Sequence, residues 1–223
     1  MNKLEVLYED NHIIVVKKPC NILSQSDSTG DVDMLSLVKK YVKEKYNKPG
    51  NVYIGLVHRL DRPVGGIMVF ARSSKAASRL SNMIKKHNFT KKYLAIVTGI
   101  MEKKEGEFKD YLLKRSDGNT IVTTKGSGKE SILKYKVIDE NKSNNLSLVE
   151  IELLTGRHHQ IRVQFSSRNH YLYGDQRYGI ADKKQLALWA YMLEFIHPVK
   201  KELLSFKCLP ESKGGWQMFN IKM

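Results

Sequence analysis

The sequence has few cysteines, which disulfide-bonded domains and zinc-stabilised domains need. It contains only two cysteines, Cys20 and Cys208, which lie far apart and outside any Cys-x-x-Cys or Cys/His spacing. This usage argues against a disulfide framework or a zinc module and is typical of proteins from a reducing cytosol. We therefore expect a cytoplasmic protein.

Long apolar runs are missing as well. No uninterrupted apolar stretch is long enough to cross a bilayer, and the first residues, MNKLEVLYEDNHIIVVKK, include none of secretory length. We expect no membrane partner. With 223 residues and 41% hydrophobic content, the chain can bury a substantial core. No linker rich in proline, glycine and serine divides it, so residues 1–223 are expected to form one domain or two closely packed lobes.

Acidic residues are outnumbered by basic ones. The chain has 38 lysines and arginines against 23 acids, a net charge of +15. Such an excess favours a polyanionic partner, although a lysine-rich surface that only maintains solubility gives the same composition. The distribution favours the first interpretation, because Lys75 to Lys104 holds eight basic residues and a single acid, Glu102. This clustering indicates a basic face suited to nucleic acid.

Hydrophobic spacing predicts two amphipathic helices, at residues 33–46 and 74–87, among many strands. Asp33 is the predicted cap of the first helix, and Lys48-Pro49-Gly50 ends it. Because many strands follow one another without helices between them, the pattern favours an α+β fold with a mixed or antiparallel sheet. The predicted strands are residues 4–8, 13–17, 52–57, 67–71, 93–98, 107–113, 120–124, 131–138, 146–154, 186–195, 203–208 and 217–221.

The first motif with chemical potential is HRLDRPVGG, residues 58–66. Asp61 lies between Arg59 and Arg62, whose positive charges favour an ionised carboxylate. Pro63 and Gly65-Gly66 indicate a tight turn at a strand end, where functional side chains are often displayed. Such a carboxylate can attack an electrophilic carbon or hold a cation. The tetrapeptide alone favours a simpler role, in which Asp61 is a salt-bridge acceptor that fixes the turn.

A second motif, TGRHHQIR, covers residues 155–162. Arg157 and Arg162, together with Gln160, supply planar donors suited to carboxylate or phosphate, and we assign Arg157 to substrate binding. The pair His158-His159 invites a metal interpretation. It lacks HxxxH or HExxH spacing, however, so we expect no metal site and a polar nucleic-acid or structural role instead.

Two further segments begin or end a predicted strand with basic residues. In Lys91-Lys92-Tyr93 the tyrosine is able to stack on an unpaired base, although the segment taken alone favours a tyrosine that covers the edge of the core. In Val15-Val16-Lys17-Lys18-Pro19 an edge strand ends in lysines, and we assign Lys17 to substrate binding.

Taken in order, five blocks resemble the RluA family of RNA pseudouridine synthases. The blocks lie between residues 13 and 198 and read VVKKP, HRLDRPVGGIMVFA, KKYLAIVTG, LLTGRHHQIRVQF with YGDQRYG, and LALWAYMLEFIHP. The resemblance implies an α+β catalytic domain with a mixed, mainly antiparallel sheet, flanking helices and a central catalytic cleft. It also implies an isomerase that converts specific uridines of ribosomal or transfer RNA to pseudouridine without a metal or cofactor. We expect a monomer.

The resemblance also implies roles for individual residues. Asp61 matches the catalytic aspartate of the family, and Arg59 matches the arginine that enters the base stack when the target nucleotide flips out. Tyr93 matches the active-site tyrosine that packs against the target base. Arg162 matches an arginine that forms a salt bridge with the catalytic aspartate, and Leu188 an apolar residue against the flipped nucleotide.

The sequence departs from the family pattern at two places. Val64-Gly65-Gly66 replaces a common Thr-Ser-Gly run, and we expect the glycines to preserve the turn. Trp189 stands where many members have histidine. We also expect no S4-type RNA-binding domain before the first block, so that the catalytic domain and its basic face supply the affinity for RNA.

Two other functions are compatible with parts of the sequence. A glycoside or nucleoside hydrolase needs a second carboxylate as the acid, and candidates are available. A non-catalytic RNA-binding module needs only the basic charge and Tyr93. Neither the target uridine nor the chemical route, covalent or through a glycal, is specified by the sequence. The candidate second carboxylates are Asp110, Asp139, Glu150 and Asp175.

Overall fold

The computed structural model describes residues 4–222, and contacts between Cα atoms divide the chain into two compact units. Unit 1 comprises Met1–Phe89 and Ala190–Cys208, and unit 2 comprises Thr90–Trp189 and Leu209–Met223. The chain therefore builds most of unit 2 after Phe89, returns to unit 1 at Ala190, and ends with a second segment of unit 2. Each unit is described by itself.

Unit 1 is a sheet with two helices. Its strand order is β1-β2-β4-β10, with β3 paired to β4 and β11 paired to β10. The pairs β1–β2, β2–β4, β3–β4 and β10–β11 are antiparallel. The strands are β1 (Glu5–Glu9), β2 (Ile13–Lys18), β3 (Gly55–Leu56), β4 (Gly65–Ala71), β10 (Leu188–Ile196) and β11 (Leu203–Lys207).

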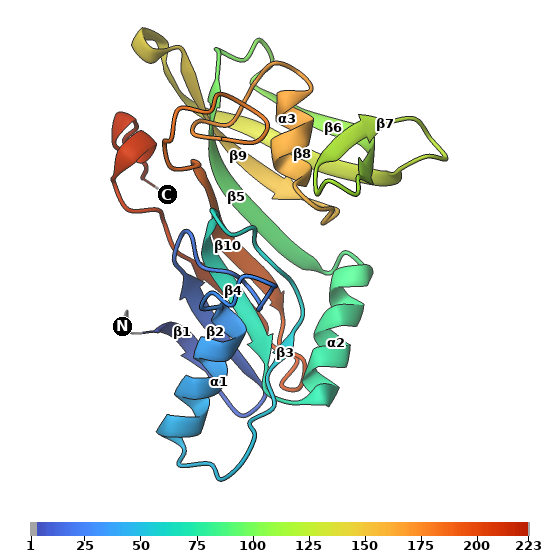
Figure 1. Cartoon of the computed structure of the whole chain (residues 1–223), viewed down its shortest axis with the longest axis vertical. Helices are drawn as coiled ribbons and strands as arrows, with labels where there is room; N and C mark the ends of the chain where they lie inside the picture. The colour runs from blue at the N-terminus through green and yellow to red at the C-terminus, as the bar shows by residue number, and fades with distance from the viewer. Residues whose placement is uncertain (1–3, 223) are drawn as a thin grey trace. The chain divides into compact units, whose positions relative to one another are not determined.

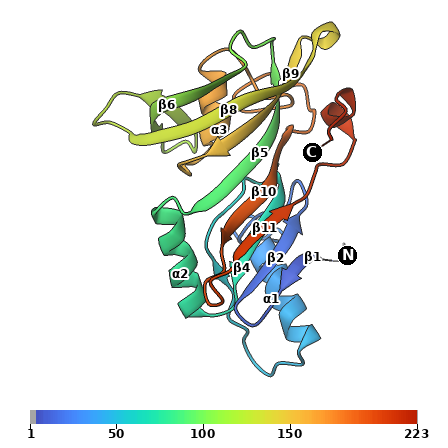
Figure 2. The same ribbon diagram turned by 180° about the vertical axis from the view of Figure 1, so that it is seen from behind.

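The helices of unit 1 are α1 (Met34–Lys45) and α2 (Ser74–Lys85). Each begins with a side-chain cap: Asp33 accepts from the N–H of Ser36 at 3.0 Å, and Ser73 accepts from the N–H of Ala76 at 3.2 Å. Helix α1 lies in front of β2 and β4 in Figure 1 and behind them in Figure 2, so it covers one face of these strands. Both predicted helices are confirmed.

Both faces of β2 are buried. Ile13 and Val15 pack in a cluster with Ala76 and Leu80 of α2, and this cluster also contains Phe89 and Phe195, whose rings stack 4.9 Å apart. Successive residues of a strand point to opposite faces, so the equally buried Ile14 and Val16 belong to the other face. Burial on both sides explains why this strand reads as a continuous apolar run.

Unit 2 is built on five strands in the order β5-β9-β8-β6-β7, and every pair in this order is antiparallel. Helix α3 packs against β6 and β8, with Phe165 contacting Phe108 and Tyr135 at ring distances of 5.0 and 5.9 Å. The elements are β5 (Phe89–Thr98), β6 (Glu105–Lys114), β7 (Thr120–Thr123), β8 (Lys129–Asn141), β9 (Leu146–Leu153), α3 (Gln160–Ser166) and the 3-10 turns η1 (Lys142–Asn144) and η2 (Gly214–Met218).

The predicted α+β class with a mainly antiparallel sheet is confirmed, two predicted strands are corrected, and one helix was missed. Residues 217–221 form no strand, because the chain turns at Gly214, with φ of +55°, into η2. The strand predicted at 52–57 is limited to Gly55–Leu56. Helix α3 was not predicted. Every helix among residues 4–222 is too short or too polar to cross a membrane.

Gly66 is required by the close approach of two strands rather than by the turn. The turn runs from Asp61 to Val64, whose N–H donates to the carbonyl of Asp61 at 3.0 Å, and Gly65-Gly66 are the first residues of β4. Gly66 has φ of +127°, and a Cβ there would lie 2.2 Å from the carbonyl oxygen of Ala190 in β10. The expectation that these glycines preserve the turn is therefore corrected for Gly66.

Gly66→Ala should destabilise the protein by about 3 kcal/mol, because the added methyl group meets backbone atoms that cannot move aside. Gly30→Ala is the matched control, since Gly30 also has positive φ (+73°) but nothing within 4 Å of an added Cβ. That control should cost about 1 kcal/mol. Urea unfolding followed by circular dichroism measures both, and equal losses would contradict the steric argument.

Candidate active site

The turn that carries Asp61 is fixed on its N-terminal side by a buried serine. Leu60 is 6% exposed and Ser24 is 5% exposed. The Ser24 hydroxyl donates to the carbonyl oxygen of Leu60 at 2.6 Å and accepts from the N–H of Leu60 at 3.0 Å. One side chain thus satisfies both backbone groups of the residue before Asp61, so this loop buries no unpaired peptide group here.

The C-terminal side of the turn is held by a buried lysine. Lys18 has no exposed surface, and its ammonium donates to the carbonyl oxygens of Val64, Arg62 and Pro19 at 2.6, 3.0 and 3.1 Å. Burial lowers the pKa of Lys18 to about 8, and the nearby charge of Asp61 opposes part of that shift. The backbone is thus anchored on both sides of Asp61, while Asp61 itself is a partly exposed residue.

Arg59 projects from the same loop toward solvent. Its neighbours are anchored, since Leu60 is buried and His58 accepts the N–H of Val69 on its Nε2 at 3.1 Å. Arg59 itself is exposed, whereas Arg62 forms an ion pair with Asp31 at 2.8 Å. Unit 1 therefore places the predicted Arg59 and Asp61 in one anchored loop.

Lys17 lies on the opposite face of β2 from Lys18. It lies opposite Glu5 of the neighbouring strand β1 and forms an ion pair with it at 3.2 Å. This contact gives no support to the predicted substrate role of Lys17, which stays a prediction. Its neighbour Lys18 is the lysine of the VVKKP block that contacts the Asp61 turn.

In unit 2, Arg162 and Asp175 form a buried, two-pronged ion pair. Arg162 donates from Nε and Nη2 to the two carboxylate oxygens of Asp175 at 2.8 and 2.6 Å, and Asp175 is 1% exposed. Burial alone would raise the pKa of Asp175. The bonds and charge of Arg162, with the N–H groups of Arg177 and Tyr178, outweigh burial and lower that pKa. Arg162 is thus held in one orientation.

The two histidines of TGRHHQIR support this arrangement. His158 shares a hydrogen bond with the hydroxyl of Thr120 at 2.9 Å, and His159 with that of Tyr178 at 2.7 Å. Burial, followed by the charge of Arg162, lowers the pKa of His159 to about 3, so the ring stays neutral. The expected polar role of the histidines is therefore a structural one at the start of α3.

The other predicted residues of unit 2 lie on β5, β10 and the loop before α3. Tyr93 is 6% exposed on β5, directly opposite Ile151 of β9. Leu188 is 4% exposed and is the first residue of β10. Arg157 is exposed, and its Nε donates to the carbonyl oxygen of Glu130 at 3.0 Å.

The family model for RNA pseudouridylate synthases matches residues 12–167, which is more than half of the chain. The chain belongs to this family. The pseudouridine synthase is 33% identical over 205 residues to the uncharacterised RNA pseudouridine synthase YhcT of Bacillus subtilis, covering 91% of this chain and 67% of that protein. It is 32% identical to the ribosomal large subunit pseudouridine synthase D of Zymomonas mobilis, covering 91% and 68% of the two chains. The predicted membership of the RluA family is confirmed.

Solved structures support the fold of this synthase. The human RNA pseudouridylate synthase domain containing 4 superposes with a TM-score of 0.78 at 20% identity, covering 96% of this chain and 90% of that chain. The human domain containing 1 gives 0.71 at 22% identity, covering 94% and 84%. At these identities the likeness concerns the fold alone.

Most carboxylates that a hydrolase could use as a second acid are engaged elsewhere in unit 2. Asp110 pairs with Arg168 at 3.0 Å, and Glu150 pairs with Lys92 at 3.0 Å. A general acid needs a carboxyl with a raised pKa that keeps its proton, whereas the pKa of Asp175 is lowered. These contacts weigh against the hydrolase interpretation.

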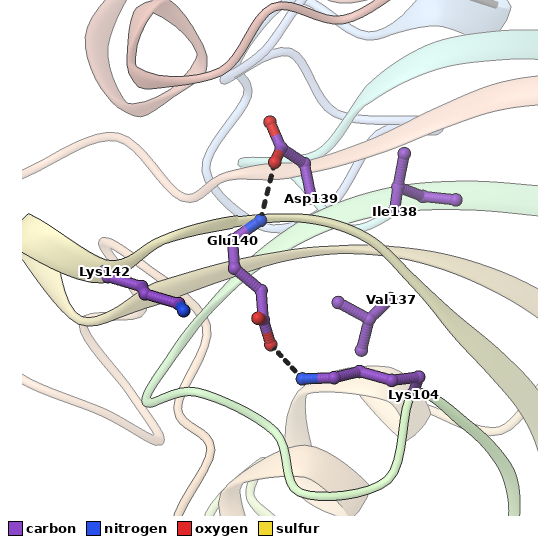
Figure 3. A pocket seen from close by; sticks show the side chains of 6 residues that line it. All are labelled: Lys104, Val137, Ile138, Asp139, Glu140 and Lys142. Carbon is purple, nitrogen blue, oxygen red and sulfur yellow. Dashed lines mark hydrogen bonds and ion pairs between the residues drawn. The ribbon is translucent and has the colours of Figure 1, made fainter.

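The remaining carboxylate, Asp139, lines a shallow hollow on unit 2 (Figure 3). In this hollow Glu140 pairs with Lys104, and Asp139 accepts the N–H of Glu140 at 2.8 Å. Glu140 is therefore engaged by Lys104, and Asp139 accepts a backbone N–H, so neither stands out as the acid of a hydrolase. Its lining residues are Lys104, Val137, Ile138, Asp139, Glu140 and Lys142.

The sequence interpretation missed Lys18, Ser24 and the pairing of Asp175. A signal existed for Lys18, which precedes proline in VVKKP, but a strand buried on both faces does not show which of two adjacent lysines points inward. Ser24 carried no signal, because a serine in a polar segment is compatible with any loop. Asp175 was noted only as a possible acid of a hydrolase.

Asp175→Asn should destabilise the synthase by about 3 kcal/mol at pH 7, because Arg162 keeps its charge in a buried place without a compensating carboxylate. The folded-state pKa of Asp175 is lowered, so its stabilisation is present above the unfolded pKa of about 3.9 and is lost as pH falls below it. The difference between the wild type and the variant should therefore shrink near pH 3.

Urea unfolding at pH 7 and pH 3 measures this difference. Asp182→Asn is the control, since Asp182 pairs with Lys184 at the surface and should leave the midpoint unchanged. A difference between wild type and Asp175→Asn that persists unchanged at pH 3 would show that the ion pair is not its source.

Proposed function

We propose that this pseudouridine synthase uses Asp61 to isomerise uridines that flip out of structured RNA. The observation that carries the proposal is the anchoring of the backbone on both sides of Asp61 by Ser24 and Lys18, while Asp61 as a residue stays partly exposed. A rigid backbone under an accessible carboxylate is what a nucleophile or base requires, because it has to meet the reacting carbon in one geometry. A simple surface salt bridge needs no such support.

The reaction replaces one glycosidic bond by another. The bond between N1 of uracil and C1′ of ribose breaks, the base rotates, and a bond from C5 to C1′ forms. The proton leaves C5 and N1 gains one, so the reaction consumes no oxidant or external energy. Asp61 acts either by attacking C1′ or by taking a proton from C2′ to give a glycal, and both routes begin from the same carboxylate.

The other residues of the proposed site assist base flipping and orient the carboxylate. Extruding a nucleotide costs a few kcal/mol, which Arg59 would offset in the stack and Tyr93 and Leu188 would offset at the expelled base. A guanidinium has five N–H donors. Asp175 takes two of those of Arg162, and the others are not used by Asp175. The salt bridge of Arg162 with the catalytic aspartate, which the family resemblance implies, stays a prediction.

Large-subunit ribosomal RNA is the first substrate to test, with transfer RNA second. Support comes from the printed names of relatives, which include ribosomal large subunit pseudouridine synthases D and C, and from the net charge of +15. We propose that both units form one catalytic domain and that the synthase works as a cytoplasmic monomer without a metal or cofactor.

Asp61→Asn should abolish pseudouridine formation, because an amide neither attacks C1′ nor accepts the C2′ proton, while folding and RNA binding are retained. Tritium release from RNA labelled at C5 of uridine measures turnover. Asp31→Asn is the matched control, since Asp31 is an acid that pairs with Arg62 of the same loop, and it should retain most activity.

Measurable turnover by Asp61→Asn would refute the assignment. Release of free uracil by the wild type would instead identify a hydrolase. RNA binding by the wild type without any pseudouridine in ribosomal or transfer RNA pools would identify a non-catalytic binding module.

A further inference from the structure

Lys91 is a half-buried cation that has no acidic partner among residues 4–222. Its ammonium lies close to the backbone of Gly156, where a Cβ would be 3.5 Å from Nζ. Burial lowers the pKa of Lys91, and no charge or hydrogen bond from the described residues opposes that effect. Keeping an unpaired ammonium in such a place disfavours the free protein, which points to an anion that joins it in a complex.

The next lysine on the same strand differs in this respect. Lys92 forms an ion pair with Glu150 of β9 at 3.0 Å. Successive residues of a strand point to opposite faces, so Lys91 shares a face of β5 with Tyr93, and Lys92 does not. Residues two apart on a strand are separated by roughly 6.6 Å. Lys91 is thus within reach of the nucleotide that Tyr93 is proposed to contact.

A second cation, Arg157, follows Gly156 in the chain. Its backbone N–H donates to Oε1 of Gln160 at 3.0 Å, while its Nε donates to the carbonyl of Glu130 at 3.0 Å. These bonds fix the loop and the side chain through neutral acceptors. Among residues 4–222 no acid forms an ion pair with Arg157, so no carboxylate competes with a ligand for its guanidinium.

We propose that Lys91, together with the guanidinium of Arg157, binds one backbone phosphate of the RNA beside the nucleotide that Tyr93 contacts. The inference rests on the proposed function, because it takes the Tyr93 face of β5 as the side on which the target nucleotide lies. A phosphate supplies the negative charge that Lys91 lacks, and the contact would be read out as a salt-dependent contribution to affinity.

Lys91→Gln and its matched control Lys92→Gln test this site. The probe is an unmodified transcript of large-subunit ribosomal RNA, with bulk transfer RNA as the alternative, titrated at several KCl concentrations. Lys91→Gln should weaken binding about 5- to 10-fold and reduce the slope of log K against log salt by about 1, whereas Lys92→Gln should stay within about twofold. Lys91→Arg should retain the wild-type slope.

Thermal melting of the free proteins separates binding from a structural role. Removing an unpaired buried charge should leave the melting temperature of Lys91→Gln unchanged or raised. A melting temperature several degrees lower, or a salt slope equal to that of the wild type, would overturn the phosphate site.

Neutral linkages locate the phosphate. A methylphosphonate at one linkage flanking the modified uridine should weaken the wild type and have little further effect on Lys91→Gln, because both changes remove the same contact. Equal losses in both proteins at every linkage would contradict the proposal. If Lys91→Gln shows the wild-type salt slope while Asp61→Asn is inactive, only the proposed phosphate site is refuted. If Asp61→Asn turns over RNA, the proposed function is refuted instead.

Discussion

A lysine ammonium with no access to solvent holds the turn on which the proposed chemistry depends. Lys18 donates to three backbone carbonyl oxygens, and Ser24 bonds to both the N–H and the carbonyl of Leu60. The conformation of the loop around Asp61 is therefore determined by contacts from β2 and from the segment after it. Burying a charge at this position is costly unless each donor is used. The burial of β2 on both faces, with helices to cover it, is what makes such a place available.

The fold could be predicted where pattern and local chemistry agree. Asp33 followed by an apolar stripe identified α1, and the succession of strands identified the α+β class. Prediction failed where tertiary contacts decide. Helix α3 has seven residues and buries polar side chains such as Gln164, which bonds to the carbonyl of Ser131, so no amphipathic stripe marks it. The strand expected at 217–221 was lost because Gly214 turns the chain.

The site could be predicted as a set of residue types in order, but not as a set of contacts. The ordered blocks identified the family, which the comparisons confirm, and with it Asp61 as the proposed catalytic residue. The pairing of Arg162 with Asp175 could not be predicted from the sequence, since the two residues are thirteen positions apart with a loop between them. Nor could the sequence distinguish Lys91, without a counter-charge, from Lys92, which has one, because the difference lies in Glu150 on the neighbouring strand.

The central claim is that Asp61 carries out the isomerisation for which this family is named. Mapping pseudouridine at nucleotide resolution in three isogenic strains tests it most directly: the parent, a deletion strain, and a strain with Asp61→Asn at the chromosomal locus. We predict that the substitution removes the same positions as the deletion, with the protein present at parental abundance. Retention of every parental pseudouridine in the Asp61→Asn strain, at positions lost in the deletion, would contradict the account.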